Sequence, residues 1–114
     1  MSCRAGLGGT AALRVAIEFS AAAPRSLAVS WSPDTVSGAH CKKLEYARIF
    51  LVALGTEPQR IYLDIVDRHP ATSLQLSEAL AAGEYAIEID AYGSASWGDG
   101  RLDARGRSAS FTVV

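Results

Sequence analysis

The amino-acid sequence predicts an all-β fold, an antiparallel Greek-key β-sandwich of about seven strands. Short runs in which large apolar residues alternate with polar ones recur along the chain, and this is the period of a strand with one buried face. Turn-forming residues separate these runs roughly every ten positions. No long stretch requires a helix, so the strands are expected to make up the whole fold.

Size and composition set the outer limits of the prediction. The chain has 114 residues, of which 49% are apolar and 20% charged, as in an ordinary globular protein. Residues 1–10 are Gly-rich and predict a flexible lead-in, and residues 11–114 predict a single domain. The net charge of −1 argues against nucleic acid as a partner. We expect no transmembrane segment, since no apolar run approaches the roughly 18 residues needed to cross a bilayer, and we recognise no signal peptide.

The first strands are predicted from alternation. Four large apolar residues occupy alternate positions within 13–19, and Pro24 breaks the pattern. The alternation resumes at 27–31, where Trp31 is expected to face inward. The segment 35–43 shows no period, so it is a connection or an edge segment.

The middle of the chain leaves two alternatives open. Segment 44–54 carries apolar residues at both parities, which suits a central strand, but Leu44, Ala47 and Leu51 also fit helical spacing. The β-branched and aromatic residues there favour the strand. Segment 73–82 is either a short strand followed by a corner, which we favour, or a two-turn helix.

The clearest alternation of the chain lies in two later strands. One runs over 61–66, and the other, over 85–91, is expected to be half-buried. In the second of these strands Glu88 and Asp90 share the outward face, where a solvated polar face explains them. The chain ends in a last predicted strand at 108–114.

The spacing of Leu80, Gly83 and Tyr85 resembles the start of the sixth strand in bacterial immunoglobulin-like and fibronectin-III-like modules. The resemblance implies that the Tyr85 hydroxyl bonds back to the chain just upstream and fixes a corner between two sheets. It also implies a core position for Trp31. Modules of this kind act as spacers, adhesins or accessory binding domains, so the resemblance implies a binding or structural role.

The two cysteines, Cys3 and Cys41, have no zinc-ligand spacing. They could form one disulfide or remain free thiols, and Cys3 with its Gly-rich spacer also fits a lipidated cysteine. His40 and Cys41 are adjacent, so on an extended strand they point to opposite faces and cannot readily pair as a catalytic couple. We therefore predict no catalytic residue, no metal site and no cofactor, and we predict that the protein is not an enzyme.

The segment 93–107 is the strongest candidate for a binding site. Its Gly98-Asp99-Gly100 turn favours a long ribbon with an aromatic tip and arginines on the returning arm. Aromatic residues and arginine are enriched at interface hot spots. The candidate binding residues are Tyr92, Trp97, Asp99, Arg101 and Arg105. A solvated hairpin, with the tryptophan folded back on the sheet, is the competing interpretation.

These observations predict a non-catalytic binding or adhesion-type module of the cell envelope or exterior, contacting a protein or a glycan. The alternative is a structural subunit of a filament, shell or phage-like assembly, in which exposed strand edges pair between copies. A weaker third hypothesis is an accessory domain of a polysaccharide-active enzyme.

Overall fold

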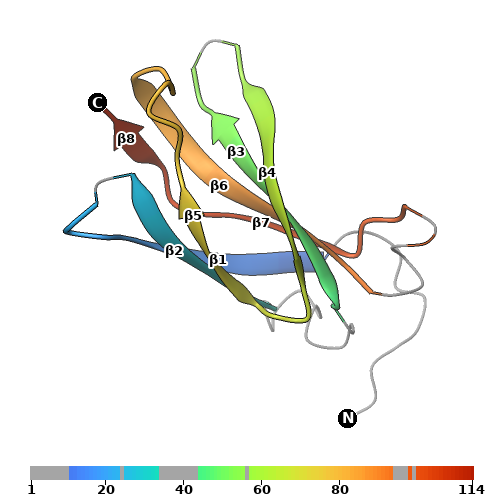
Figure 1. The fold of residues 1–114 in the computed structure, drawn as a ribbon. Helices are drawn as coiled ribbons and strands as arrows, with labels where there is room; N and C mark the ends of the chain where they lie inside the picture. The colour runs from blue at the N-terminus through green and yellow to red at the C-terminus, as the bar shows by residue number, and fades with distance from the viewer. Residues whose placement is uncertain (1–10, 24, 34–43, 56, 94–97, 99) are drawn as a thin grey trace.

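The described part of the chain forms eight β-strands and the connections between them (Figure 1). The computed structural model describes residues 11–23, 25–33, 44–55, 57–93, 98 and 100–114. The strands are β1 (Ala11–Phe19), β2 (Ser26–Pro33), β3 (Tyr46–Ala53), β4 (Gln59–Asp67), β5 (Ala71–Gln75), β6 (Gly83–Tyr92), β7 (Ala104–Arg107) and β8 (Phe111–Val113). The all-β prediction is confirmed. Within these described residues, no helix is long and apolar enough to cross a bilayer.

The strands belong to one mixed sheet, and this corrects the predicted topology. Seven strands follow the order β4-β3-β6-β7-β1-β2-β5, and β8 pairs with β6. β7 pairs antiparallel with β6 and parallel with β1, so it joins the two halves of the sheet (Figure 1). The sheet curls into a nearly closed, barrel-like shape. The purely antiparallel Greek-key sandwich, and with it the resemblance to immunoglobulin-like and fibronectin-III-like modules, is therefore wrong.

The parallel pairing depends on a close approach that alternation alone does not predict. Gly106 in β7 lies against Leu13 in β1, and a Cβ placed at Gly106 would overlap the Leu13 carbonyl oxygen and come within 2.7 Å of its Cβ. A glycine allows the two backbones to meet there. The alternation of a strand indicates which face each residue occupies but not which strand lies beside it. The pairing of β7 with β1 and β6 could therefore not be predicted from the sequence.

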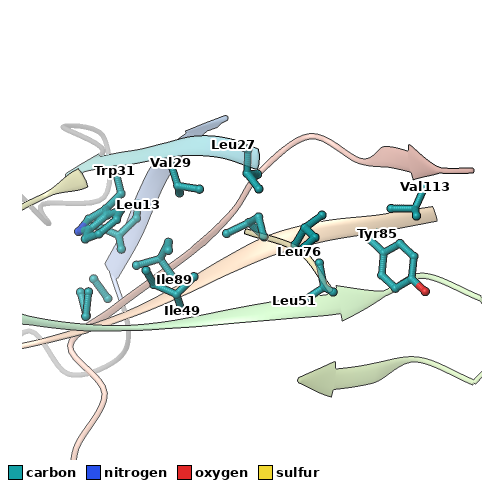
Figure 2. Close-up of a cluster of buried hydrophobic side chains, with 14 residues drawn as sticks. Leu13, Leu27, Val29, Trp31, Ile49, Leu51, Leu76, Tyr85, Ile89 and Val113 are labelled. Atoms are coloured by element: carbon teal, nitrogen blue, oxygen red, sulfur yellow. The ribbon is translucent and has the colours of Figure 1, made fainter. Parts of the chain in front are cut away.

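The apolar residues of both halves of the sheet meet in one core (Figure 2). Trp31 faces this core, as predicted, and is 8% exposed. The most deeply buried large side chains come from β2, β3 and β6: Val29, Ile49, Leu51, Ile87 and Ile89.

Both ambiguous segments adopt the favoured structure. Segment 44–54 forms β3, which pairs with β4 on one side and β6 on the other. Segment 73–82 is the end of β5 followed by a corner, in which the Leu80 amide donates to the Ser77 carbonyl at 3.1 Å. The corner ends at Tyr85, whose hydroxyl donates to the Ala81 carbonyl at 2.6 Å. The bond expected of Tyr85 is present, although the fold is not the one that suggested it.

Strand β6 differs from the expected half-buried strand because both of its faces are covered. Ala86, Glu88 and Asp90 point away from the core, yet they are only 1%, 5% and 3% exposed. The prediction of a solvated polar face for the two acids is therefore wrong. Arginine side chains from β4 and β7 cover them.

Candidate functional site: an acid–arginine cluster on the outer face

Five charged side chains meet on the outer face of the sheet, the face turned away from the core. β6 supplies Glu88 and Asp90 at its centre. The antiparallel register of β7 places Arg107 opposite Glu88 and Arg105 opposite Asp90. Arg60 reaches the same two acids from β4, across the intervening strand β3. We call these five residues the acid–arginine cluster.

Each carboxylate of the cluster accepts hydrogen bonds from two arginines. Arg60 bridges the pair, since its Nε lies 2.6 Å from Glu88 Oε1 and its Nη2 lies 2.5 Å from Asp90 Oδ2. Arg105 donates two hydrogen bonds to Asp90, at 2.6 and 2.9 Å. Arg107 donates to Glu88 Oε2 from Nη2 at 3.0 Å and from Nε at 3.3 Å. Paired guanidinium bonds of this kind fix orientation as well as position.

The acids are buried while the arginines remain partly exposed. The side chains of Glu88 and Asp90 are 7% and 4% exposed, whereas those of Arg60, Arg105 and Arg107 are 38%, 45% and 50% exposed. The arginines thus form a lid over the acids and still present part of their surface to solvent.

The ionisation of the cluster is set by its hydrogen bonds. Burial by itself raises the pKa of Asp90, but hydrogen bonds from Arg105 and Arg60 and their charges outweigh it, so this pKa lies below its ordinary value. The hydrogen bond to Asp90 also raises the pKa of Arg105. Asp90 is consequently a carboxylate at neutral pH and is poorly suited to act as a general acid.

Aromatic rings fill the space beside the cluster on β3, β4 and β6. The Arg60 guanidinium carbon lies 3.6 Å from the centre of the Phe50 ring. Tyr62 meets the same ring edge-on at 5.8 Å, and Arg48 lies over the Tyr92 ring at 5.6 Å. These rings and arginines lie on the outer face of β4, β3 and β6, next to the arginines of β7.

The predicted binding residues fall in different places. Arg105 belongs to the acid–arginine cluster. Tyr92 is only 7% exposed at the end of β6, so its ring is largely covered, and Arg101 is exposed after the loop. Trp97 and Asp99 lie outside the described residues, as do Cys3, His40 and Cys41. The structure therefore brings Arg105 and Tyr92 to one face and leaves the recognition loop as a prediction.

Sequence reasoning missed the cluster as a unit. Arg105 and Arg107 stand two apart, as do Glu88 and Asp90, so a hairpin joining the two segments would have brought opposite charges together. That signal was present in the sequence. Arg60 comes from another hairpin, and no local pattern links it to the acids.

Among the described residues, the cluster is not accompanied by a group of metal-ligating side chains. In the part of the chain that the structure describes, no three His, Cys, Asp or Glu side chains are grouped so as to hold a metal ion. Likewise, every buried side-chain nitrogen or oxygen of the described residues has a hydrogen-bond partner. The sequence matches no protein-family model, and no curated protein matches it.

Proposed function

We propose that this protein is a non-catalytic binding module whose contact surface is the arginine- and aromatic-rich outer face of β4, β3, β6 and β7. The partner is a protein or a glycan that carries acidic groups. The observation behind the proposal is that two buried carboxylates hold three arginine side chains in place while leaving each of these side chains 38% to 50% exposed.

The charge of this face supports an acidic partner. The cluster holds three guanidinium groups against two carboxylates, and Arg48 on β3 lies beside it. The whole chain has a net charge of −1, so the one extra positive charge is a property of the cluster itself. Complementary charge steers association and selects among partners.

The rigidity of the face also supports binding. Arg60 and Arg105 each make two hydrogen bonds to acids, and Arg60 is stacked on Phe50, so these side chains have little freedom left to lose when a partner docks. Apolar contact area is available next to them, since Tyr62 is 54% and Ile65 is 41% exposed. Arginine and tyrosine in one rigid patch are the composition of an interface hot spot.

A charge-removal experiment tests the proposal. The protein and two variants, Arg48→Gln and Arg14→Gln, are compared on an array of sulfated, sialylated and neutral glycans and of acidic peptides. Both arginines are exposed strand residues, but Arg14 lies on β1, outside the cluster. We expect the wild-type chain to bind at least one acidic probe, Arg48→Gln to weaken that binding about tenfold, and Arg14→Gln to leave it unchanged.

The outcomes distinguish binding at the outer face from binding elsewhere on the molecule. Equal weakening by both variants would indicate a non-specific charge effect and would count against the proposal, as would the absence of any bound probe. The predicted recognition loop is tested by Trp97→Ala combined with Arg101→Ala. Loss of binding in that variant alone would move the site from the outer face to the loop. A place at the cell envelope or exterior stays a prediction.

A further inference from the structure

One edge of β4 is not paired with another described strand, and the strand carries exposed apolar side chains. β4 has nine residues and pairs with β3, and none of the other described strands lies along its second edge (Figure 1). Ile61, Tyr62 and Ile65 are 39%, 54% and 41% exposed. Natural edge strands are usually short or covered by charge, and an exposed apolar edge is a template for pairing with another strand.

A β-bulge at Leu63 determines which side chains of β4 share a face. Asp64 pairs with Ile49 of β3, but the next β3 residue, Phe50, pairs with Tyr62, so Leu63 is an extra residue in β4. An extra residue shifts the alternation of faces by one position. The register therefore places four β4 residues on the outer face, Arg60, Tyr62, Ile65 and Asp67, and places Ile61 and Val66 on the inner one.

We propose that two copies of this chain pair antiparallel through β4, about a two-fold axis that passes between Leu63 and Asp64. A two-fold axis perpendicular to the sheet brings a residue opposite a residue of its own face. In a regular strand, odd and even positions lie on opposite faces. An axis between two residues pairs odd with even positions, so it would set residues of opposite faces against each other. The bulge shifts the alternation at that point and restores the match.

The pairs that this axis creates are chemically complementary. They are Arg60 with Asp67, Tyr62 with Ile65 and Ile61 with Val66, each occurring twice. Opposite charges and aromatic–aliphatic pairs are the favourable cross-strand combinations. Shifting the register by two positions would place Arg60 opposite Ile65 and separate the charges.

Charge balance favours the same arrangement. The acid–arginine cluster has three arginines for two acids, and Arg60 is its member on β4. The Asp67 side chain is 60% exposed and lies 3.5 Å from the exposed Arg68. In the proposed dimer the Asp67 of each copy lies opposite the backbone position of Arg60. The Arg60 guanidinium is turned the other way, toward Glu88 and Asp90, so the two charges attract at a distance and do not form an ion pair.

The test is a register-specific rescue, measured by light scattering after size exclusion and by sedimentation over a range of concentrations. The wild-type chain is expected to reach twice its mass of 12.0 kDa as concentration rises. Tyr62→Glu and Ile65→Lys each remove an apolar pair that occurs twice, and each should weaken dimerisation about tenfold. The double variant sets the introduced carboxylate opposite the introduced ammonium and should recover most of the loss.

Controls keep the result decisive. Both β4 positions are exposed, so each variant should keep the wild-type circular dichroism spectrum. Ile65→Lys should also keep the wild-type melting temperature, whereas Tyr62→Glu loses the contact with Phe50 and should lower it slightly. Ser73→Lys on β5, the strand at the other end of the sheet, should leave the dimer unchanged. A wild-type monomer at every concentration overturns the proposal. A double variant that dimerises no better than its parents also overturns it. So does a mass that grows beyond the dimer in the wild type but not in Ser73→Lys, because that result would indicate open assembly of β4 onto β5.

Discussion

Replacing Glu88 by glutamine removes one buried charge from the acid–arginine cluster while keeping the size of the side chain. The Glu88 carboxylate accepts from Arg60 at 2.6 Å and from Arg107 at 3.0 and 3.3 Å. Glutamine keeps one acceptor oxygen, but its amide group carries donors, and the neighbouring guanidinium groups are donors as well. The variant therefore leaves two arginines with too few acceptors.

The size of the effect follows from burial. Removing one partner of a fully buried ion pair destabilises a protein by about 3 to 5 kcal/mol. The Arg60 and Arg107 side chains are 38% and 50% exposed, so water can replace part of what is lost. After this discount we expect the free energy of unfolding to fall by about 2 kcal/mol.

Urea denaturation at pH 7 measures the effect, and the chain offers a matched control. Glu84→Gln is the same substitution in the same strand, but Glu84 is exposed. We expect Glu84→Gln to change stability by less than about 0.5 kcal/mol. With a slope of about 1.3 kcal/mol per molar urea, Glu88→Gln should lower the midpoint by ~1.5 M. Equal shifts in the two variants, or no shift in either, would refute the assignment of Glu88 to a stabilising buried cluster.

Three further predictions concern Asp90, Gly106 and Tyr85. The pKa of Asp90 is lowered on folding, so its contribution to stability is complete above the unfolded pKa of roughly 3.9 and is lost as pH falls through the folded pKa. Urea titrations below about pH 4 should therefore show a smaller difference in unfolding free energy between wild type and Asp90→Asn. Gly106→Ala should lower the melting temperature sharply, since its methyl group would overlap a β1 carbonyl, whereas Gly55→Ala, with no atom within 4 Å, should not. Tyr85→Phe removes a single hydroxyl bond of 2.6 Å and should reduce the free energy of unfolding by about 1 kcal/mol in a denaturant titration, and a neutral result would deny that bond a stabilising role.

Local pattern determined much of the fold. Alternation at 13–19 and 27–31 predicted β1 and β2 and the inward direction of Trp31, because a strand with one buried face must repeat every two residues. The same reasoning favoured β3 within 44–54. The all-β class and the faces of most strands could therefore be predicted from the sequence alone.

The site, in contrast, was decided by tertiary structure. Glu88 and Asp90 alternate like any solvated strand face, and only the insertion of β7 and the reach of Arg60 bury them. Contacts between distant segments depend on which strands become neighbours, and alternation carries no information about neighbours. The sequence by itself determined which residues of most strands face the core, although not in β4, where a bulge shifts the alternation. The tertiary structure alone decided that the acids on the opposite face lie beneath arginines.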